Sequence, residues 1–178
     1  MSNYRRAHAP GAIYFFTLAT LGRKPILTEE PSRAALRAAI QQVRVLFPFV
    51  IDGWVLLPDH MHCLWRLPVG DAEYGKRWGL IKRHVTRELG CSGDPVSLAR
   101  RTRHEGGLWQ RRFWEHQVRD DADYRRHLDY LHWNPVKHGY VQRVIDWPYS
   151  SFHRYVRDGV LPVDWGGGAA PATGAFGE

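Results

Sequence analysis

The sequence predicts an α+β domain, in which helices pack on a sheet of mostly antiparallel strands. Segments with strand character and segments with helical periodicity follow one another in the order strand, helix, strand, strand, helix, strand, and one further helix comes last. Two of the strands are joined only by Pro58 and Asp59, and so tight a connection favours an antiparallel pair. This order predicts a sheet with its helices gathered on one side.

The first elements are three strand segments and a helix. Residues 12–21 are rich in β-branched and aromatic side chains, which are typical of a strand. A helix begins near Thr28, because acidic residues and a proline follow in its first turn, and Pro48 ends it. Residues 50–57 and 60–67 are the two strands of the antiparallel pair.

The remaining elements alternate in the same way. Apolar side chains of helical period predict a helix around residues 78–89. Residues 91–108 are rich in Gly, Ser, Arg and Pro and predict a long loop, and 113–118 resume as a strand. A last helix begins near Arg119 and is expected to end at Pro135, because a proline disfavours helical geometry in the residue before it.

Length and composition predict one domain over residues 1–165. The Gly- and Ala-rich stretch 166–178 cannot build a core and is expected to be disordered. No apolar run approaches the roughly 20 residues that span a bilayer, and the first sixteen residues lack the apolar block of a signal peptide. We therefore expect a cytoplasmic protein without a membrane partner.

Charge points to a polyanionic partner. Lysine and arginine number 25 against 18 acidic residues, for a formal net charge of +7. Basic residues can contact phosphates while aromatic rings stack on unpaired bases. The alternative is a solvated loop beside aromatic core residues. The candidate DNA-binding residues are Lys82, Arg83, Arg103, Trp109, Arg111 and Arg112.

Two histidines stand one residue apart in the stretch LPDHMHCLW. Residues two apart on a strand share a face, so His60 and His62 would project side by side, while Cys63 and Trp65 face a core. Two converging imidazoles suit a metal ion. The alternative is an ordinary pair of surface or half-buried histidines.

The last helix adds a second group of polar side chains. On a helical wheel, His127, Tyr130 and Asn134 cluster about a quarter turn from the apolar face. Asn134 lies one turn after Tyr130, and its amide oxygen can bind a metal. Taken alone, Tyr130 is better explained as a half-buried packing residue; together with the histidine pair and the basic, aromatic surface it becomes a candidate nucleophile.

Three segments carry a resemblance to a known family: PDHMHCLW (58–65), WQRRFWEHQVRDDADYRRHLDYLHWNPVKHGYV (109–141) and DWPYSSFHRYV (146–156). Together they resemble the REP-associated tyrosine transposases, relatives of the single-tyrosine transposases of the insertion-sequence 200/605 group within the HUH (His-hydrophobic-His) endonucleases. The similarity covers most of residues 10–165. It implies a ferredoxin-like core, with the histidines on a central strand and the nucleophile on the helix after the last core strand.

The resemblance also implies roles for individual residues. His60 and His62 match the metal-binding pair and Tyr130 matches the nucleophile, while Asn134 stands where relatives often carry a glutamine ligand. Mixed nitrogen and oxygen ligands suit Mg²⁺ or Mn²⁺, with a catalytic zinc as an alternative. Either the metal or His127 could activate the phenol.

The expected function is cleavage and rejoining of single-stranded DNA at or near a hairpin, through a 5′-phosphotyrosine intermediate. Three alternatives stay open: a mobile insertion-sequence transposase proper, a non-catalytic DNA-binding protein on the same fold, and a metal-dependent hydrolase that uses water. The sequence leaves monomer and homodimer equally open.

Overall fold

A computed structural model describes residues 9–90 and 107–166. Most of the predicted loop, 91–106, and most of the tail predicted to be disordered, 167–178, lie outside the described residues. No helix within the described ranges combines the length and hydropathy that a bilayer-spanning segment needs. The elements are β1 (Ile13–Ala19), η1 (Leu21–Arg23), α1 (Glu30–Leu46), β2 (Val50–Leu56), β3 (His60–Arg66), α2 (Tyr74–Glu88), β4 (Trp114–Gln117), α4 (Asp121–Lys137), η3 (Val144–Asp146) and α5 (Phe152–Arg157).

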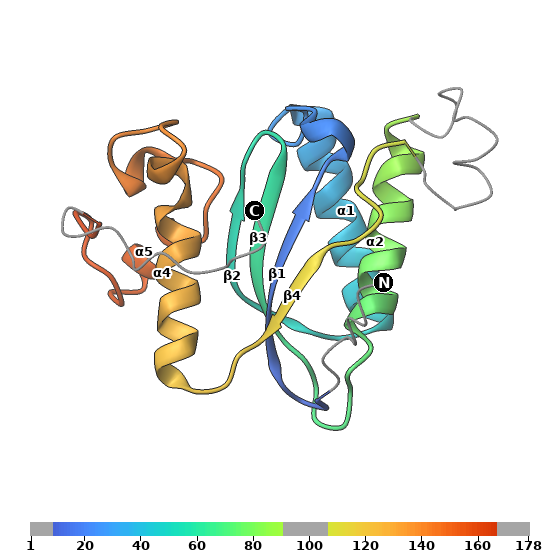
Figure 1. Ribbon diagram of the computed structural model, residues 1–178, viewed down its shortest axis with the longest axis horizontal. Helices are drawn as coiled ribbons and strands as arrows, with labels where there is room; N and C mark the ends of the chain where they lie inside the picture. Colours follow the sequence, from blue (N-terminus) through green and yellow to red (C-terminus); the bar gives the residue numbers. More distant parts are fainter. Residues whose placement is uncertain (1–8, 91–106, 167–178) are drawn as a thin grey trace, which may run out of the picture.

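The four strands form one sheet in the order β2-β3-β1-β4 (Figure 1). β3 pairs antiparallel with β2 and with β1, and β1 pairs antiparallel with β4. The predicted α+β class and antiparallel sheet are confirmed. The strand that carries the two histidines, β3, lies inside the sheet with a neighbour on each side.

Helices cover both faces of the sheet: α1 and α2 lie on one face and α4 lies on the other (Figure 1). The prediction that all helices gather on one side is therefore wrong for the last helix. The cause is that β1 is apolar on both faces. Phe15 belongs to the core under α4 and Phe16 to the core under α1 and α2, and neither is exposed to solvent. Each apolar face needs its own cover.

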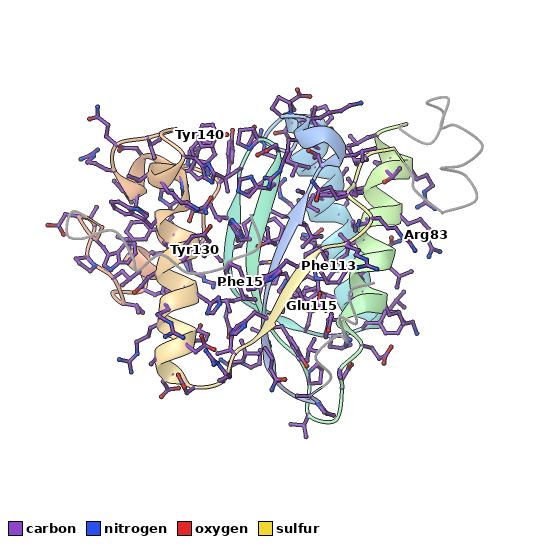
Figure 2. The ribbon with its side chains drawn as sticks, viewed as in Figure 1. Phe15, Arg83, Phe113, Glu115, Tyr130 and Tyr140 are labelled. Carbon is purple, nitrogen blue, oxygen red and sulfur yellow. The ribbon has the colours of Figure 1, made fainter. Side chains whose placement is uncertain are left out.

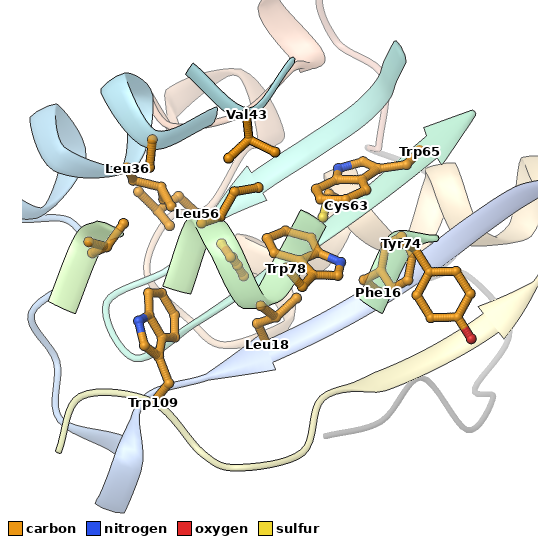
Figure 3. Packing of buried hydrophobic residues seen from close by; sticks show 14 of the residues in the cluster. Phe16, Leu18, Leu36, Val43, Leu56, Cys63, Trp65, Tyr74, Trp78 and Trp109 are labelled. Atoms are coloured by element: carbon orange, nitrogen blue, oxygen red, sulfur yellow. The ribbon is translucent and has the colours of Figure 1, made fainter. Parts of the chain in front are cut away.

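The core under α1 and α2 is built around aromatic rings (Figure 3). Trp65 of β3 and Trp78 of α2 stack with their ring centroids 4.0 Å apart and an interplanar angle of 20°. Phe16 of β1 contacts the edge of Trp65 at 5.1 Å. All three side chains are fully buried. Because large aromatic rings bury much apolar surface, this face supplies most of the hydrophobic stabilisation.

The core under α4 is smaller, and it depends on a close approach of helix and sheet. Leu128 and Leu131 of α4 pack on Val55 and Leu64. A Cβ atom at Gly53 of β2 would lie only 2.9 Å from Cδ1 of Leu128. A glycine at this position therefore lets α4 lie close to β2 and to its neighbour β3, which carries the histidines.

The end of α4 differs from the sequence-based prediction. The helix continues through Pro135 to Lys137, so the expectation that Pro135 ends it is wrong. Proline removes the N–H that would donate to the carbonyl of Leu131, a local cost that does not stop the helix, because the amide of His138 still donates to the Asn134 carbonyl at 3.0 Å. The C-cap is His138, and the next residue, Gly139, has a φ of +72°. The amides of Gly139 and Tyr140 donate to the carbonyls of Val136 and Pro135, at 2.9 and 3.0 Å, which is a Schellman motif.

The segment after α4 covers the outer edge of β2. The amide of Ser151 donates to the Trp54 carbonyl at 2.7 Å, and the amide of Leu56 donates to the Tyr149 carbonyl at 2.9 Å. The indole N–H of Trp147 donates to the Leu56 carbonyl at 3.0 Å. The DWPYSS sequence thus blocks an edge that could otherwise pair with another chain. Helix α5, which follows it, is too short for its periodicity to be recognised in the sequence.

Candidate active site

The two histidines of β3 lie side by side under α4, as the sequence predicts. His60 is 1% exposed and His62 is 0% exposed, and their ring centroids are 5.1 Å apart. Met61, Cys63 and Trp65 belong to the core on the opposite face. Strand alternation therefore separates imidazole side chains from apolar ones on the same strand.

Each imidazole is held by a hydrogen bond through Nδ1. Nδ1 of His60 lies 2.7 Å from Oδ1 of Asp59, and Nδ1 of His62 lies 2.8 Å from Oγ1 of Thr17. Thr17 is directly opposite His62 in the β1–β3 register. When Nδ1 carries the proton, Nε2 of each ring is the atom that can ligate a metal. Burial lowers the pKa of His60, outweighing the opposite effect of Asp59, and so favours the neutral imidazole that binds metals.

Helix α4 brings Tyr130 to the same place, and Asn134 lies one turn further along the helix, one turn before His138, whose ring is 5.1 Å from that of His60. The N-cap of the helix is Asp120, whose carboxylate accepts a hydrogen bond from the amide of Asp123 at 2.7 Å. Leu131 lies on the apolar face of the helix and is fully buried. The ring of Tyr130 lies 5.4 Å from that of His62. Figure 2 shows Tyr130 on the side of α4 that faces the sheet. Tyr130 is 5% exposed and Asn134 is fully buried.

A lysine contacts the tyrosine hydroxyl. Nζ of Lys137 donates to Oη of Tyr130 at 3.0 Å and lies 4.9 Å from the centroid of its ring. A cation at this distance stabilises the phenolate relative to the phenol. Lys137 was not among the residues selected from the sequence, although its position seven residues after Tyr130, two helical turns, was a usable signal.

The donor set fits a divalent metal ion. Ligand nitrogens at about 2.1 Å from one ion would place two imidazole centroids roughly 5 Å apart, close to the separation of His60 and His62. The amide oxygen of Asn134 is a neutral oxygen donor on the facing helix. Two imidazoles and an amide leave room for phosphate and water, as Mg²⁺ and Mn²⁺ require.

The third candidate on α4, His127, belongs to a separate network centred on Asp123. Nδ1 of His127 lies 2.8 Å from the Asp123 carbonyl oxygen, and the imidazole of His116 stacks on that of His127 at 4.5 Å. Burial would raise the pKa of Asp123, but hydrogen bonds from His116, Arg126 and Arg119 hold it far below its usual range. Burial also lowers the pKa of His127.

Ligand atoms of His116, Asp123 and His127 lie within 4.8 Å of one another, a spacing that could hold a metal ion. Both carboxylate oxygens of Asp123, however, already accept from guanidinium groups: Arg126 binds Oδ1 at 2.6 Å and Arg119 binds Oδ2 at 3.2 Å. A cation here would compete with two arginines. Between the two possible metal positions, the donors around His60 and His62 fit better.

The structure separates the candidate DNA-binding residues. Arg111 and Arg112 are exposed just before β4. Trp109 is 5% exposed within the main core, so its ring offers no open face to a base, which contradicts the stacking role expected of it. Arg103 lies outside the described residues.

The two candidates on α2 lie across the sheet from Tyr130. Nζ of Lys82 donates to the Gln110 carbonyl at 2.7 Å, so this lysine tethers the segment before β4. Arg83 points away from the sheet on the far side of the molecule from Tyr130 (Figure 2). A phosphate at the histidine pair is therefore out of reach of Arg83.

Comparison with known proteins gives close relatives over nearly the whole chain. The REP-associated tyrosine transposase of Escherichia coli (strain K12) is 44% identical over 167 residues, which are 94% of this chain and 92% of the relative. A second curated relative, from Haemophilus influenzae, is 46% identical over 94% of each chain. A solved structure of a REP-associated tyrosine transposase bound to a REP hairpin superimposes with a TM-score of 0.85 at 42% identity, covering 100% of this chain and 98% of the solved one. No profile of a protein family matches the sequence.

Proposed function

The chain belongs to the REP-associated tyrosine transposases, and from this premise we propose that it cleaves and rejoins single-stranded DNA beside a REP-type hairpin, with Tyr130 as nucleophile. The solved relative bound to a REP hairpin supports the choice of substrate. The observation that carries the proposal is that the Tyr130 ring lies 5.4 Å from His62, with Lys137 at its hydroxyl. We place the activity in the cytoplasm.

The proposed reaction is an in-line displacement at phosphorus. Oη of Tyr130 forms a bond to phosphorus as the bond from phosphorus to the 3′ oxygen breaks. The phenolic proton is lost and the departing 3′ oxygen gains one, so the products are a 5′-phosphotyrosine and a 3′ hydroxyl. A second 3′ hydroxyl can reverse the step and join strands, because the covalent link keeps the phosphodiester energy.

The residues around the nucleophile have distinct tasks in this scheme. Lys137 stabilises the phenolate and takes the part for which His127 was one sequence-based candidate. His60, His62 and Asn134 would hold Mg²⁺ or Mn²⁺, and Asp59 and Thr17 orient the two imidazoles. A bound divalent ion would supply stabilisation of the charge that develops on the non-bridging phosphate oxygens.

The test is a search for DNA covalently attached to protein. The chain is incubated with labelled hairpin DNA that carries single-stranded flanks, in Mn²⁺, and the products are separated on a denaturing gel. Tyr130→Phe keeps the ring and removes one oxygen, so we expect cleavage and adduct to vanish together while hairpin binding stays within a few-fold. Tyr124→Phe, on the same helix, is the matched control and should react like wild type.

The possible results separate the remaining functions. An adduct in Tyr130→Phe would assign the nucleophile to another tyrosine. Cleavage by the wild-type chain without any adduct would favour a hydrolase that uses water. Hairpin binding without cleavage in any divalent metal would favour a DNA-binding protein that has kept only the fold.

A further inference from the structure

Aromatic rings form a continuous row that begins beside the histidine pair and leaves the candidate active site. The ring of His138 lies 5.1 Å from that of His60, and Tyr140 follows at 6.1 Å from His138. Trp147 is 5.4 Å from Tyr140, and Tyr149 is 5.6 Å from Trp147. Two of the steps, His138 to Tyr140 and Tyr140 to Trp147, have interplanar angles of only 33° and 31°.

The row crosses the edge of the sheet. Trp147 packs on the core under α4, whereas Tyr149 packs on the core under α1 and α2, and the chain between them is bound to the edge strand β2. The Schellman motif that ends α4 sets the direction in which the chain leaves the helix at Tyr140, a residue that is 44% exposed. Figure 2 shows Tyr140 beyond the end of α4, past Tyr130.

The row ends at a basic groove. A groove of about 470 Å³ lies between α1 and residues 148–151, and the described residues that line it include Arg33, Arg37 and Arg44 but no acidic residue. The guanidinium of Arg33 lies 4.7 Å from the centroid of the Tyr149 ring and also pairs with Glu30 outside the groove. Arginines over a ring, beside hydroxyl groups of serine, are suited to phosphate and base.

We propose that this row and groove, which we call the edge path, bind a single strand of DNA that continues from the active site around the edge of the sheet to α1. The inference rests on the proposed function for the identity of the strand. Rings spaced at 5–6 Å offer successive stacking surfaces only to unpaired bases, and the arginines contact the phosphates. Arg111 and Arg112 take no part in it.

The test measures binding of a fluorescent oligothymidylate of about twelve nucleotides, within the usual range of single-strand site sizes. A chelator is present, so no cleavage is needed. Tyr140→Ala should weaken binding about tenfold, the usual scale of one base–aromatic contact, whereas Tyr140→Phe, which keeps the ring, should bind within twofold of wild type. Thermal melting verifies that each variant is folded.

The arginines of the basic groove are tested with a second pair of variants, one in the groove and one outside it. Arg37→Ala should weaken binding and reduce the slope of log affinity against log salt by about 0.7, the value for one phosphate on a single strand. Arg125→Ala removes another exposed arginine, from α4, and should leave both quantities nearly unchanged.

The edge path is overturned if wild type does not bind the oligothymidylate, if Tyr140→Ala binds it like wild type, or if Arg37→Ala and Arg125→Ala are indistinguishable. It is also overturned if a duplex of equal length competes as well as the single strand. A failure of Tyr130 to form an adduct would refute the proposed chemistry and leave these binding results unaffected.

Discussion

The two faces of the sheet differ in what they bury. The face under α1 and α2 is filled by stacked aromatic rings such as Trp65 and Trp78. The face under α4 has a smaller apolar cluster and, beside it, a group of buried polar side chains. They include Thr17, His60, His62, His127 and Asn134. Buried polar groups cost free energy unless they are hydrogen-bonded, and among the described residues the buried imidazoles all lie on β3 and α4, which indicates where stability has been exchanged for chemistry.

Strand β3 carries this difference within its own sequence. His62 faces α4 and the adjacent Cys63 faces the aromatic core, and both are fully buried. A shift of one residue in the pairing with β1 would exchange the two faces. Substitutions at neighbouring positions of one strand can therefore test the two faces separately.

The largest expected effect is the loss of cleavage in His62→Phe, which keeps a planar ring and removes both ring nitrogens. A metal contributes several kcal/mol of transition-state stabilisation, so the cleavage rate should fall by about 10³-fold or more. Calorimetric titration with Mn²⁺ should show weakened binding, while hairpin binding stays within a few-fold. Undiminished Mn²⁺ affinity would place the metal elsewhere.

Cys63→Ala is the matched control on the other face. It should lower the free energy of unfolding by about 1 kcal/mol, the typical cost of a point substitution, and leave the cleavage rate and Mn²⁺ affinity unchanged at temperatures well below unfolding. Impaired Mn²⁺ binding in Cys63→Ala would mean that the two faces are not independent.

The next largest effect is expected on the aromatic face. Trp78→Ala should lower the free energy of unfolding by about 3–5 kcal/mol, because it leaves a cavity beside Trp65. The indole Nε1 of Trp78 has no hydrogen-bond partner among the described residues, so Trp78→Phe should cost much less. Urea unfolding measures both. Similar losses in the two variants would mean that the indole nitrogen, and not ring volume, stabilises this core.

Local periodicity was enough to predict one part of the site. Strand alternation correctly predicted that His60 and His62 share a face, and helical spacing correctly predicted that Tyr130 and Asn134 lie one turn apart. These relations hold within a single element, and they need no knowledge of which elements are neighbours. The roles assigned to these residues remain predictions.

The parts of the site and fold that local periodicity does not predict depend on contacts between segments that are distant in the sequence. Thr17 lies opposite His62 because of the register between β1 and β3, and this register cannot be read from the sequence. The arginines around Trp109 predict a base-stacking residue. In the structure a β-bridge to Thr20, at the end of β1, holds Trp109 in the core. The local rule for proline predicts a helix end at Pro135, but the end of α4 is set by the Schellman motif that follows it.

Apart from the Cys63→Ala control, the smallest expected effect concerns pH, and it too distinguishes the faces. The buried histidines of the described residues, His60, His62, His127 and His132, lie on β3 and α4 and none lies under α1 or α2. Burial, assisted by the charge of Arg154, lowers the pKa of His132 from 6.5 to about 3. Between these values the unfolded chain binds a proton that the folded chain does not, so stability falls as the pH falls.

The variant that isolates this effect is His132→Gln, which retains a side-chain amide that can bond to Ser151, the present partner of Nε2 at 3.0 Å. With an unfolded pKa of 6.5, one neutral buried histidine costs about 1.4 kcal/mol between pH 7.5 and pH 5.5. Urea unfolding at the two pH values should therefore show a smaller difference in the variant than in wild type, by about that amount. Equal pH dependence in the two proteins would mean that His132 is protonated in the folded state, and the acid sensitivity assigned to the α4 side would then have to come from His60 and His127 alone.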